Sequence, residues 1–157
     1  MNLLIQPGAN LNSGNTNRIG WFWGEFYEGI KYANTVIDRI DDAEFDSDAQ
    51  KNEILAGAYF HRAYRYYRLT QQFGDVPLIL HEITSARLDF VTTARTTILE
   101  KMRDDLNIAI GNLPDVVDRG QVNKAAALHL LTKVNLALSD FDAAITSASS
   151  VINGPNA

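Results

Sequence analysis

The stretch that decides the fold is residues 56–80, AGAYFHRAYRYYRLTQQFGDVPLIL. Large side chains recur through it at intervals of three and four residues, which is the spacing of one face of an α-helix. The periodic segment begins at Leu55 and extends to Phe73, where Gly74 can adopt the left-handed conformation that often ends a helix. Pro77 follows and cannot continue a helix. The pattern therefore predicts one long helix that ends at Gly74.

The start of that helix is marked by Ser47, with Gln50 three residues later, which is the sequence of a capping box. The acidic segment around it also matches positions one, three, five, seven and twelve of a calcium-binding loop, through Asp42, Glu44, Asp46, Asp48 and Glu53. The sixth position of such a loop requires glycine for its sharp turn, and here it is Ser47. A solvated acidic turn explains the segment better, while calcium binding stays open.

Similar periodicity predicts four further helices, at residues 21 to about 40, 95–112, 122–138 and 141–152. Residues 1–20 contain proline, several glycines and asparagines without a sustained period, which indicates an irregular lead-in. Residues 78–93 are aperiodic and rich in β-branched side chains, so we expect a connecting loop with one short extended piece. The sequence thus predicts an all-α domain over residues 21–157.

The last two predicted helices resemble a tetratricopeptide unit, in which two antiparallel helices pack through small residues. Ala144 and Ala148 occupy the small positions of the second helix, and Leu128 and Leu131 the core positions of the first. The match is degenerate, because Leu128 stands where that repeat has a large aromatic residue. The predicted fold class is therefore all-α, built from antiparallel helix pairs with degenerate tetratricopeptide-like repeats.

Composition excludes several classes of function. The formal net charge of -5 repels phosphate backbones, so nucleic acid is not an expected partner. The absence of cysteine removes disulfides, thiolate nucleophiles and thiolate metal sites. The three histidines, at positions 61, 81 and 129, lie on different predicted elements and lack metal-ligand spacing. Since no catalytic or cofactor-binding motif is present either, we expect neither an enzyme nor a bound cofactor or metal.

Two aromatic clusters remain as candidate sites. The long helix interleaves aromatic and basic residues, but its rings fit a core face better than a binding surface. Arg62 falls on that core face, where an arginine must pair with a carboxylate. Near the start of the first predicted helix, the spacing of Trp23 and Tyr27 favours packing of Trp23 inward. Trp21 and Phe22 cannot both face the core, so Trp21 is the candidate for stacking on a ligand.

Residues 53–78 resemble the signature helix and turn of the SusD/RagB family, through Arg62 followed by Ala63-Tyr64 and through Phe73-Gly74-Asp75-Val76-Pro77-Leu78. Residues 23–34, 98–113 and 124–145 resemble further family helices in the same order. The resemblance implies that Trp23, Arg62, Gly74, Asp75 and Pro77 are structural motif residues and that the fold is a helical scaffold carrying a second, loop-rich half. This chain would then be the front portion of a larger fold.

The resemblance also implies a function. Members of the family are lipid-anchored at the outer face of the outer membrane, where they bind oligosaccharides or peptides beside a SusC-like TonB-dependent transporter. The lipid-bearing cysteine of the family is not found in this chain. We therefore expect non-catalytic capture of glycans or other nutrients for import. The alternative is a free-standing tetratricopeptide-like module that holds a protein partner in its groove.

Overall fold

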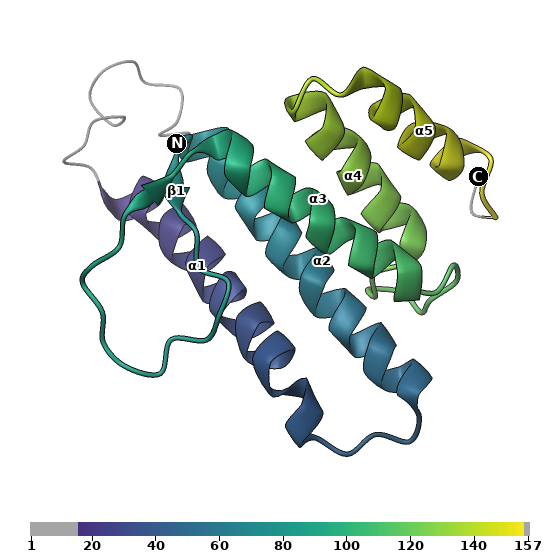
Figure 1. The fold of residues 1–157 in the computed structure, drawn as a ribbon, viewed down its shortest axis with the longest axis horizontal. Helices are drawn as coiled ribbons and strands as arrows, with labels where there is room; N and C mark the ends of the chain where they lie inside the picture. Colours follow the sequence, from purple (N-terminus) through teal and green to yellow (C-terminus); the bar gives the residue numbers. More distant parts are fainter. Residues whose placement is uncertain (1–15, 156–157) are drawn as a thin grey trace.

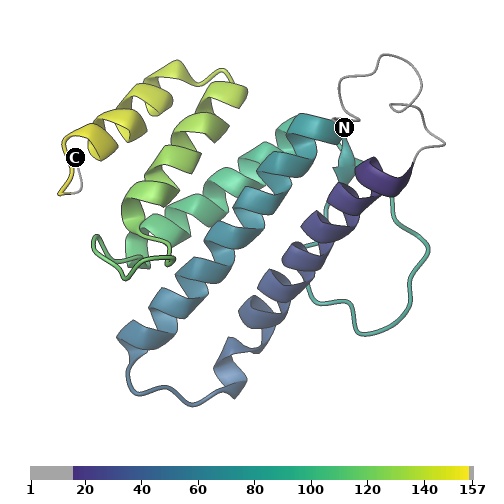
Figure 2. The same ribbon diagram turned by 180° about the vertical axis from the view of Figure 1, so that it is seen from behind.

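The computed structural model describes residues 16–155 as a row of packed helices (Figure 1). The order along the chain is α1 (Thr16–Arg39), a 3-10 turn (Ile40–Asp42), α2 (Asp48–Phe73), β1 (Val76–Pro77), β2 (Thr92–Thr93), α3 (Arg95–Asn112), α4 (Lys124–Ala137) and α5 (Phe141–Ile152). Each helix packs on the next one in sequence, so α1 and α5 lie at opposite edges of the row (Figures 1 and 2). The predicted all-α class is confirmed.

The boundaries of α2 follow the capping residues in the sequence. The Ser47 hydroxyl accepts a hydrogen bond from the Gln50 N–H at 3.2 Å, and the Gln50 side chain accepts one from the Asp46 N–H at 2.9 Å. This is a capping box shifted by one residue, since its return bond goes to the residue before the cap. At the other end, Gly74 has a φ of 72° and donates its N–H to the Thr70 carbonyl. The predicted start and end of this helix are both correct.

Two other boundaries differ from the sequence-based prediction. Helix α1 begins at Thr16 instead of residue 21, so it runs through Gly20. One glycine costs a helix only about 1 kcal/mol, which a helix of 24 residues tolerates. Helix α4 begins at Lys124 instead of residue 122, because the Asn123 side chain caps it by accepting the Ala126 N–H at 2.9 Å. Residues 1–15 of the predicted lead-in lie outside the described part.

The core lies where α2 meets α1 and α3, and it continues into α4. Its largest fully buried apolar side chains are Ile30, Tyr66, Leu69, Val76, Ile98, Leu99, Met102, Leu106 and Val134. The α4 and α5 pair is joined by a 2.9 Å hydrogen bond between the hydroxyls of Thr132 and Ser147, next to the buried Ala144. None of the helices between residues 16 and 155 is both long and apolar enough to cross a membrane.

Candidate functional site

The segment between α2 and α3 leaves the helices and returns to them as a strap, which we define as residues 78–91 (Figure 1). The residues that flank it form a short antiparallel pairing, in which Val76 lies opposite Thr93 and Pro77 opposite Thr92. Asp75 accepts a hydrogen bond from the Arg95 N–H at 2.9 Å, which satisfies a free donor at the start of α3. The strap therefore begins and ends at one fixed point.

Polar side chains of α1 and α2 hold the first part of the strap by its backbone. The Tyr66 hydroxyl accepts the Ile79 N–H at 2.6 Å and donates to the Ile79 carbonyl at 3.1 Å. The Asn34 amide donates to the carbonyls of Ile79 and His81, at 3.0 and 3.2 Å. Because these donors sit on buried side chains, they fix the path of residues 79–81 against the helices.

Arg62 lies at the centre of this arrangement. Its guanidinium pairs with Asp105 through two bonds, of 2.7 and 2.9 Å, and both side chains are almost completely buried. Its third nitrogen donates to the Asn34 side chain at 3.0 Å and to the Leu80 carbonyl at 2.9 Å. The expectation that Arg62 needs a carboxylate partner is confirmed, and the pair joins α1, α2, α3 and the strap.

A second set of contacts connects the strap to the carboxyl-terminal end of α1. The Asp38 carboxylate accepts the Glu82 N–H at 2.6 Å and lies 3.1 Å from the His81 ring. The hydrogen bond from the Glu82 N–H is the main reason that the pKa of Asp38 lies below its usual value, and the His81 ring lowers it further. The Glu82 carboxylate in turn accepts from Arg39 at 2.6 Å. Unlike the Arg62 pair, these groups lie at the surface, where ion pairs contribute little to stability.

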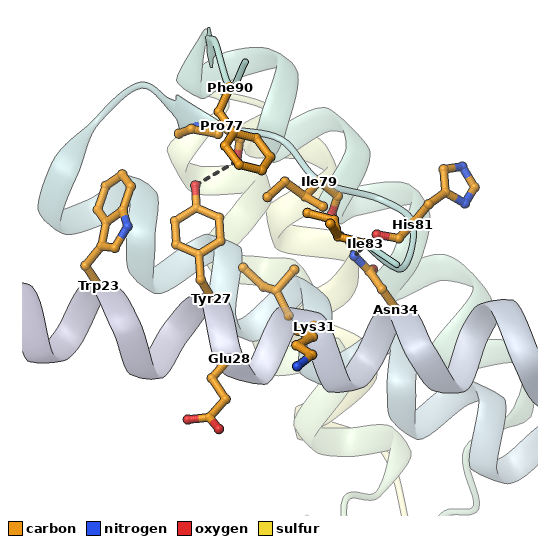
Figure 3. A pocket seen from close by; sticks show the side chains of 11 residues that line it. Trp23, Tyr27, Glu28, Lys31, Asn34, Pro77, Ile79, His81, Ile83 and Phe90 are labelled. Carbon is orange, nitrogen blue, oxygen red and sulfur yellow. Dashed lines mark hydrogen bonds between the residues drawn. The ribbon is translucent and has the colours of Figure 1, made fainter. Parts of the chain in front are cut away.

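A cavity of about 480 Å³ lies between α1 and the strap (Figure 3). Its lining residues are Trp23, Tyr27, Glu28, Ile30, Lys31, Asn34, Pro77, Ile79, His81, Ile83 and Phe90. Two polar groups of its wall are already used, since the Tyr27 hydroxyl donates to the Pro77 carbonyl at 2.7 Å and Asn34 bonds to the strap and to Arg62. Burial raises the pKa of Tyr27. The cavity suits an apolar or aromatic group more than a hydroxyl-rich one.

The amino-terminal half of α1 presents the two tryptophans. Trp21 is 57% exposed, and its ring packs edge-on against Phe22 at a centroid distance of 4.9 Å. The Trp23 ring packs against Tyr27 at 4.9 Å and Phe73 at 5.1 Å, yet it is 36% exposed and lies at one end of the cavity. The sequence predicted that Trp23 packs inward; the structure shows its contacts with Tyr27 and Phe73 but leaves it exposed at the cavity, a position that was not predicted. Both tryptophans therefore keep part of their surface exposed at this end of α1.

Some of the aromatic and basic residues of α2 pack in or against the core, whereas His61, Tyr64 and Arg68 are exposed. Tyr66 is completely buried, and the Arg65 guanidinium lies over the Phe26 ring at 5.9 Å. His61 lies beside Phe60, and partial desolvation, followed by the charge of Arg65, lowers its pKa. These contacts account for part of the interleaved aromatic and basic pattern of α2, which is also found in some ligand-binding helices.

The acidic turn before α2 uses several of its side chains locally. Asp41 pairs with Lys51 at 2.6 Å, and Asp46 lies 3.5 Å from the Gln50 amide. Among residues 16–155, no group of three or more acidic or histidine side chains is placed to hold a metal ion. His81 lies at the strap, while His61 and His129 lie on α2 and α4.

Comparison with known proteins gives a consistent match. A family described as starch-binding and associating with the outer membrane matches residues 5–136. SusD-like protein P2 of Formosa agariphila is 34% identical over 148 residues, which are 92% of this chain and 29% of the relative.

Two solved structures have the same fold over most of this chain. A laminarin-binding SusD-like protein has a TM-score of 0.79 and 30% identity, over 85% of this chain and 30% of its own. A structure with a xylogluco-oligosaccharide has a TM-score of 0.83 and 26% identity, over 94% and 31%. The chain thus spans less than a third of the length of these proteins.

Proposed function

The chain belongs to the SusD-like family of starch-binding proteins that associate with the outer membrane, and we propose that it forms part of a protein that captures oligosaccharides without cleaving them. The bound glycan would be delivered at the outer face of the outer membrane to a SusC-like TonB-dependent transporter. The relatives that bind laminarin or were solved with a xylogluco-oligosaccharide support glycans as the ligand class.

The observation that carries this proposal is the exposed aromatic surface at the start of α1. Trp21 presents more than half of its surface to solvent, and Trp23 about a third. A flat indole ring can cover the apolar C–H face of a pyranose while the sugar hydroxyls stay hydrated, which gives affinity without a deep pocket. We assign Trp21 as a glycan-stacking residue on this basis, with Trp23 beside it as a second ring.

The positions of Asp105, Glu25 and Glu28 do not suit cleavage, which favours capture without it. Glycoside hydrolysis uses two carboxyl groups that flank the bond, one as acid and the other as base or nucleophile. Asp105 is completely buried and bonded to Arg62, so it cannot reach a sugar. Glu25 and Glu28 lie one turn apart on the same helix, which places them on one side of any ligand.

Affinity gel electrophoresis of the complete polypeptide that contains this chain tests the proposal. We expect at least one of laminarin, xyloglucan and starch to slow the protein when it is present in the gel. Incubation of the protein with that polysaccharide should release no reducing sugar. Trp21→Ala should weaken that retardation about tenfold in apparent Kd, the equivalent of roughly 1.4 kcal/mol. The matched control is Tyr32→Ala, another exposed aromatic residue of α1 located three turns away.

The outcomes separate the proposal from its alternatives. Equal retardation of Trp21→Ala and Tyr32→Ala would show that Trp21 is not part of the binding site. Release of reducing sugar would contradict capture without cleavage. The alternative of a tetratricopeptide-like module for a protein partner draws support from the apolar cavity, which suits an apolar side chain of a peptide. In that case none of the polysaccharides would slow the protein.

Co-purification of the complete polypeptide with a TonB-dependent transporter tests the proposed delivery.

A further inference from the structure

The cavity between α1 and the strap is walled mainly by aromatic and aliphatic side chains (Figure 3). Trp23 and Tyr27 of α1 contribute two rings whose centroids lie 4.9 Å apart, and Phe90 contributes a third ring from the strap. Ile79 and Ile83 add aliphatic side chains from the strap. A molecule inside this cavity would therefore contact mainly carbon atoms.

The charged side chains at this cavity direct their polar groups elsewhere. The Glu28 carboxylate accepts a hydrogen bond from the Tyr32 hydroxyl at 2.8 Å, and Figure 3 shows it on the side of α1 opposite the strap. The His81 ring points away from the cavity and lies 3.1 Å from the Asp38 carboxylate. Lys31 is exposed, and a lysine in such a position lines a wall with its methylene groups while its ammonium stays in water. The cavity thus favours an uncharged occupant, because an ion inside it would lose its hydration without gaining a counter-charge from these residues.

The size of the cavity limits the occupant further. A protein cavity of about 150 Å³ is enough to hold a benzene ring, whereas this cavity has a volume of about 480 Å³. A methyl or acetyl group would leave most of that volume unfilled, and the apolar wall would then lack packing partners. An aromatic ring with a short linker fills the space better. It can also make the edge-to-face or offset contacts that aromatic rings prefer, with Trp23, Tyr27 and Phe90 as partners.

Trp23 connects this cavity to the proposed glycan surface. It is one of the two tryptophans that we assign to sugar stacking, and it also lies at one end of the cavity with 36% of its surface exposed. A sugar stacked on Trp23 would therefore carry its substituents beside the cavity. The sugar itself is a poor occupant, because its hydroxyl groups would lose water without gaining equivalent hydrogen bonds inside.

We propose that the cavity binds an aromatic acyl group that is ester-linked to a glycan, such as a cinnamoyl group, while the sugar that carries it stacks on Trp23. Such a group is uncharged, contains one aromatic ring and has a linker of the length that the volume accommodates. The glycan in this inference rests on the proposed function. Binding of the aromatic group to the cavity can be measured without any sugar.

Isothermal titration calorimetry of the complete polypeptide with methyl cinnamate tests the cavity by itself. Ile83→Trp enlarges a side chain of the cavity wall and should weaken binding by about tenfold or more, because the indole would occupy the space of the ligand. Leu88→Trp is the matched control, since Leu88 belongs to the strap but is fully exposed and outside the cavity lining. It should bind methyl cinnamate as the unsubstituted protein does.

Phe90→Ala provides a second variant of the wall. It removes one aromatic ring and should weaken methyl cinnamate binding by roughly three- to tenfold. Because Phe90 is already 42% exposed, this variant should keep its fold and gives the answer if a thermal melt shows that Ile83→Trp unfolds. No binding of methyl cinnamate to the unsubstituted protein would refute the proposal, as would full binding by Phe90→Ala and by a folded Ile83→Trp.

Esterified polysaccharides test whether the aromatic group belongs to a glycan. Laminarin, xyloglucan and starch can each be partly esterified with cinnamic acid and compared with the unmodified polymer in affinity gels. Esterification of the polymer that slows the protein should lower its apparent Kd by about tenfold. This gain should disappear in Ile83→Trp and remain in Leu88→Trp. Equal affinity for the esterified and unmodified polymers would contradict the proposal.

Two further outcomes distinguish this proposal from the proposed function and from a peptide ligand. If methyl cinnamate binds but no polymer slows the protein, esterified or not, the proposed function fails and the glycan-linked occupant fails with it. If unmodified polymers bind but methyl cinnamate does not, only the present proposal is wrong. N-acetyl-phenylalanine amide presents an aromatic ring on a peptide group and should bind more weakly than methyl cinnamate. Tighter binding of that amide would identify a peptide side chain as the occupant instead.

Discussion

Arg62 and Asp105 form a bidentate ion pair with side chains that are 4% and 0% exposed, across 43 residues of sequence. Asp105 also receives the Lys101 ammonium at 3.1 Å. Around the pair, the Leu80 carbonyl and the Asn34 amide oxygen occupy the remaining guanidinium nitrogen. A buried charge is tolerated only when it is paired and hydrogen-bonded, and here each guanidinium nitrogen of Arg62 donates at least one hydrogen bond. The pair therefore fixes the strap and three helices relative to one another.

Replacing Asp105 by Asn should destabilise the protein by about 3–5 kcal/mol, because the buried Arg62 guanidinium would lose its counter-charge. The exposed neighbour Asp104 provides the matched control. Asp104→Asn should change the free energy of unfolding by less than about 0.5 kcal/mol. Urea denaturation of both variants, followed by circular dichroism, measures the difference. Equal stability of the two variants would mean that the ion pair does not contribute as its burial implies.

The sequence predicts features that depend on residues close together in the chain. It does not predict those that depend on contacts between distant residues. The period of three and four residues and the Ser47 and Gly74 boundaries depend on residues close in sequence, so α2 was predicted correctly. The need of Arg62 for a carboxylate was also predictable, because it lies on the core face. Its partner was not, since the chain contains 19 acidic residues and the pairing depends on how α3 packs on α2.

The candidate site was less predictable than the fold. One wall of the cavity is held in place because Tyr27 bonds to the Pro77 carbonyl and Asn34 to carbonyls of the strap, and no sequence pattern marks a carbonyl as an acceptor. Spacing predicted the contact between Trp23 and Tyr27, but the aperiodic strap gave no sign that Phe90 would line the same cavity. Trp21 as a ligand residue stays a prediction, as does the extent of the domain over residues 21–157.

Two glycines of the signature segment should respond to alanine with opposite signs. Gly74 has a φ of 72° and a ψ of -120°, a conformation strained for any residue with a Cβ. Gly57 lies within α2, and a Cβ there would meet nothing within 4 Å. Gly74→Ala should therefore destabilise the protein by roughly 1–3 kcal/mol, whereas Gly57→Ala should stabilise it by about 0.5–1 kcal/mol. Thermal unfolding measures both, and destabilisation by Gly57→Ala would indicate an unexpected need for glycine there.

The buried Tyr66 should make the protein sensitive to alkali. Burial is the main reason that its pKa rises to about 12 from the ordinary value of 10.0. A raised pKa in the folded state means that the contribution of Tyr66 is complete below pH 10 and is lost as the pH rises through 10 toward 12. The ionised side chain could no longer donate to the Ile79 carbonyl, which it reaches at 3.1 Å when neutral. The free energy of unfolding should therefore fall over that interval.

Tyr66→Phe separates this effect from other alkaline titrations. The variant should be less stable at neutral pH, because the Ile79 N–H loses the hydroxyl that accepts it at 2.6 Å. Its stability should nevertheless decline less steeply between pH 10 and 12, because one buried phenol no longer ionises. Tyr64→Phe, at a partly exposed position of the same helix, should keep the original slope. Urea unfolding at intervals of pH gives both slopes, and the same decline in all three proteins would show that ionisation of Tyr66 does not control unfolding in alkali.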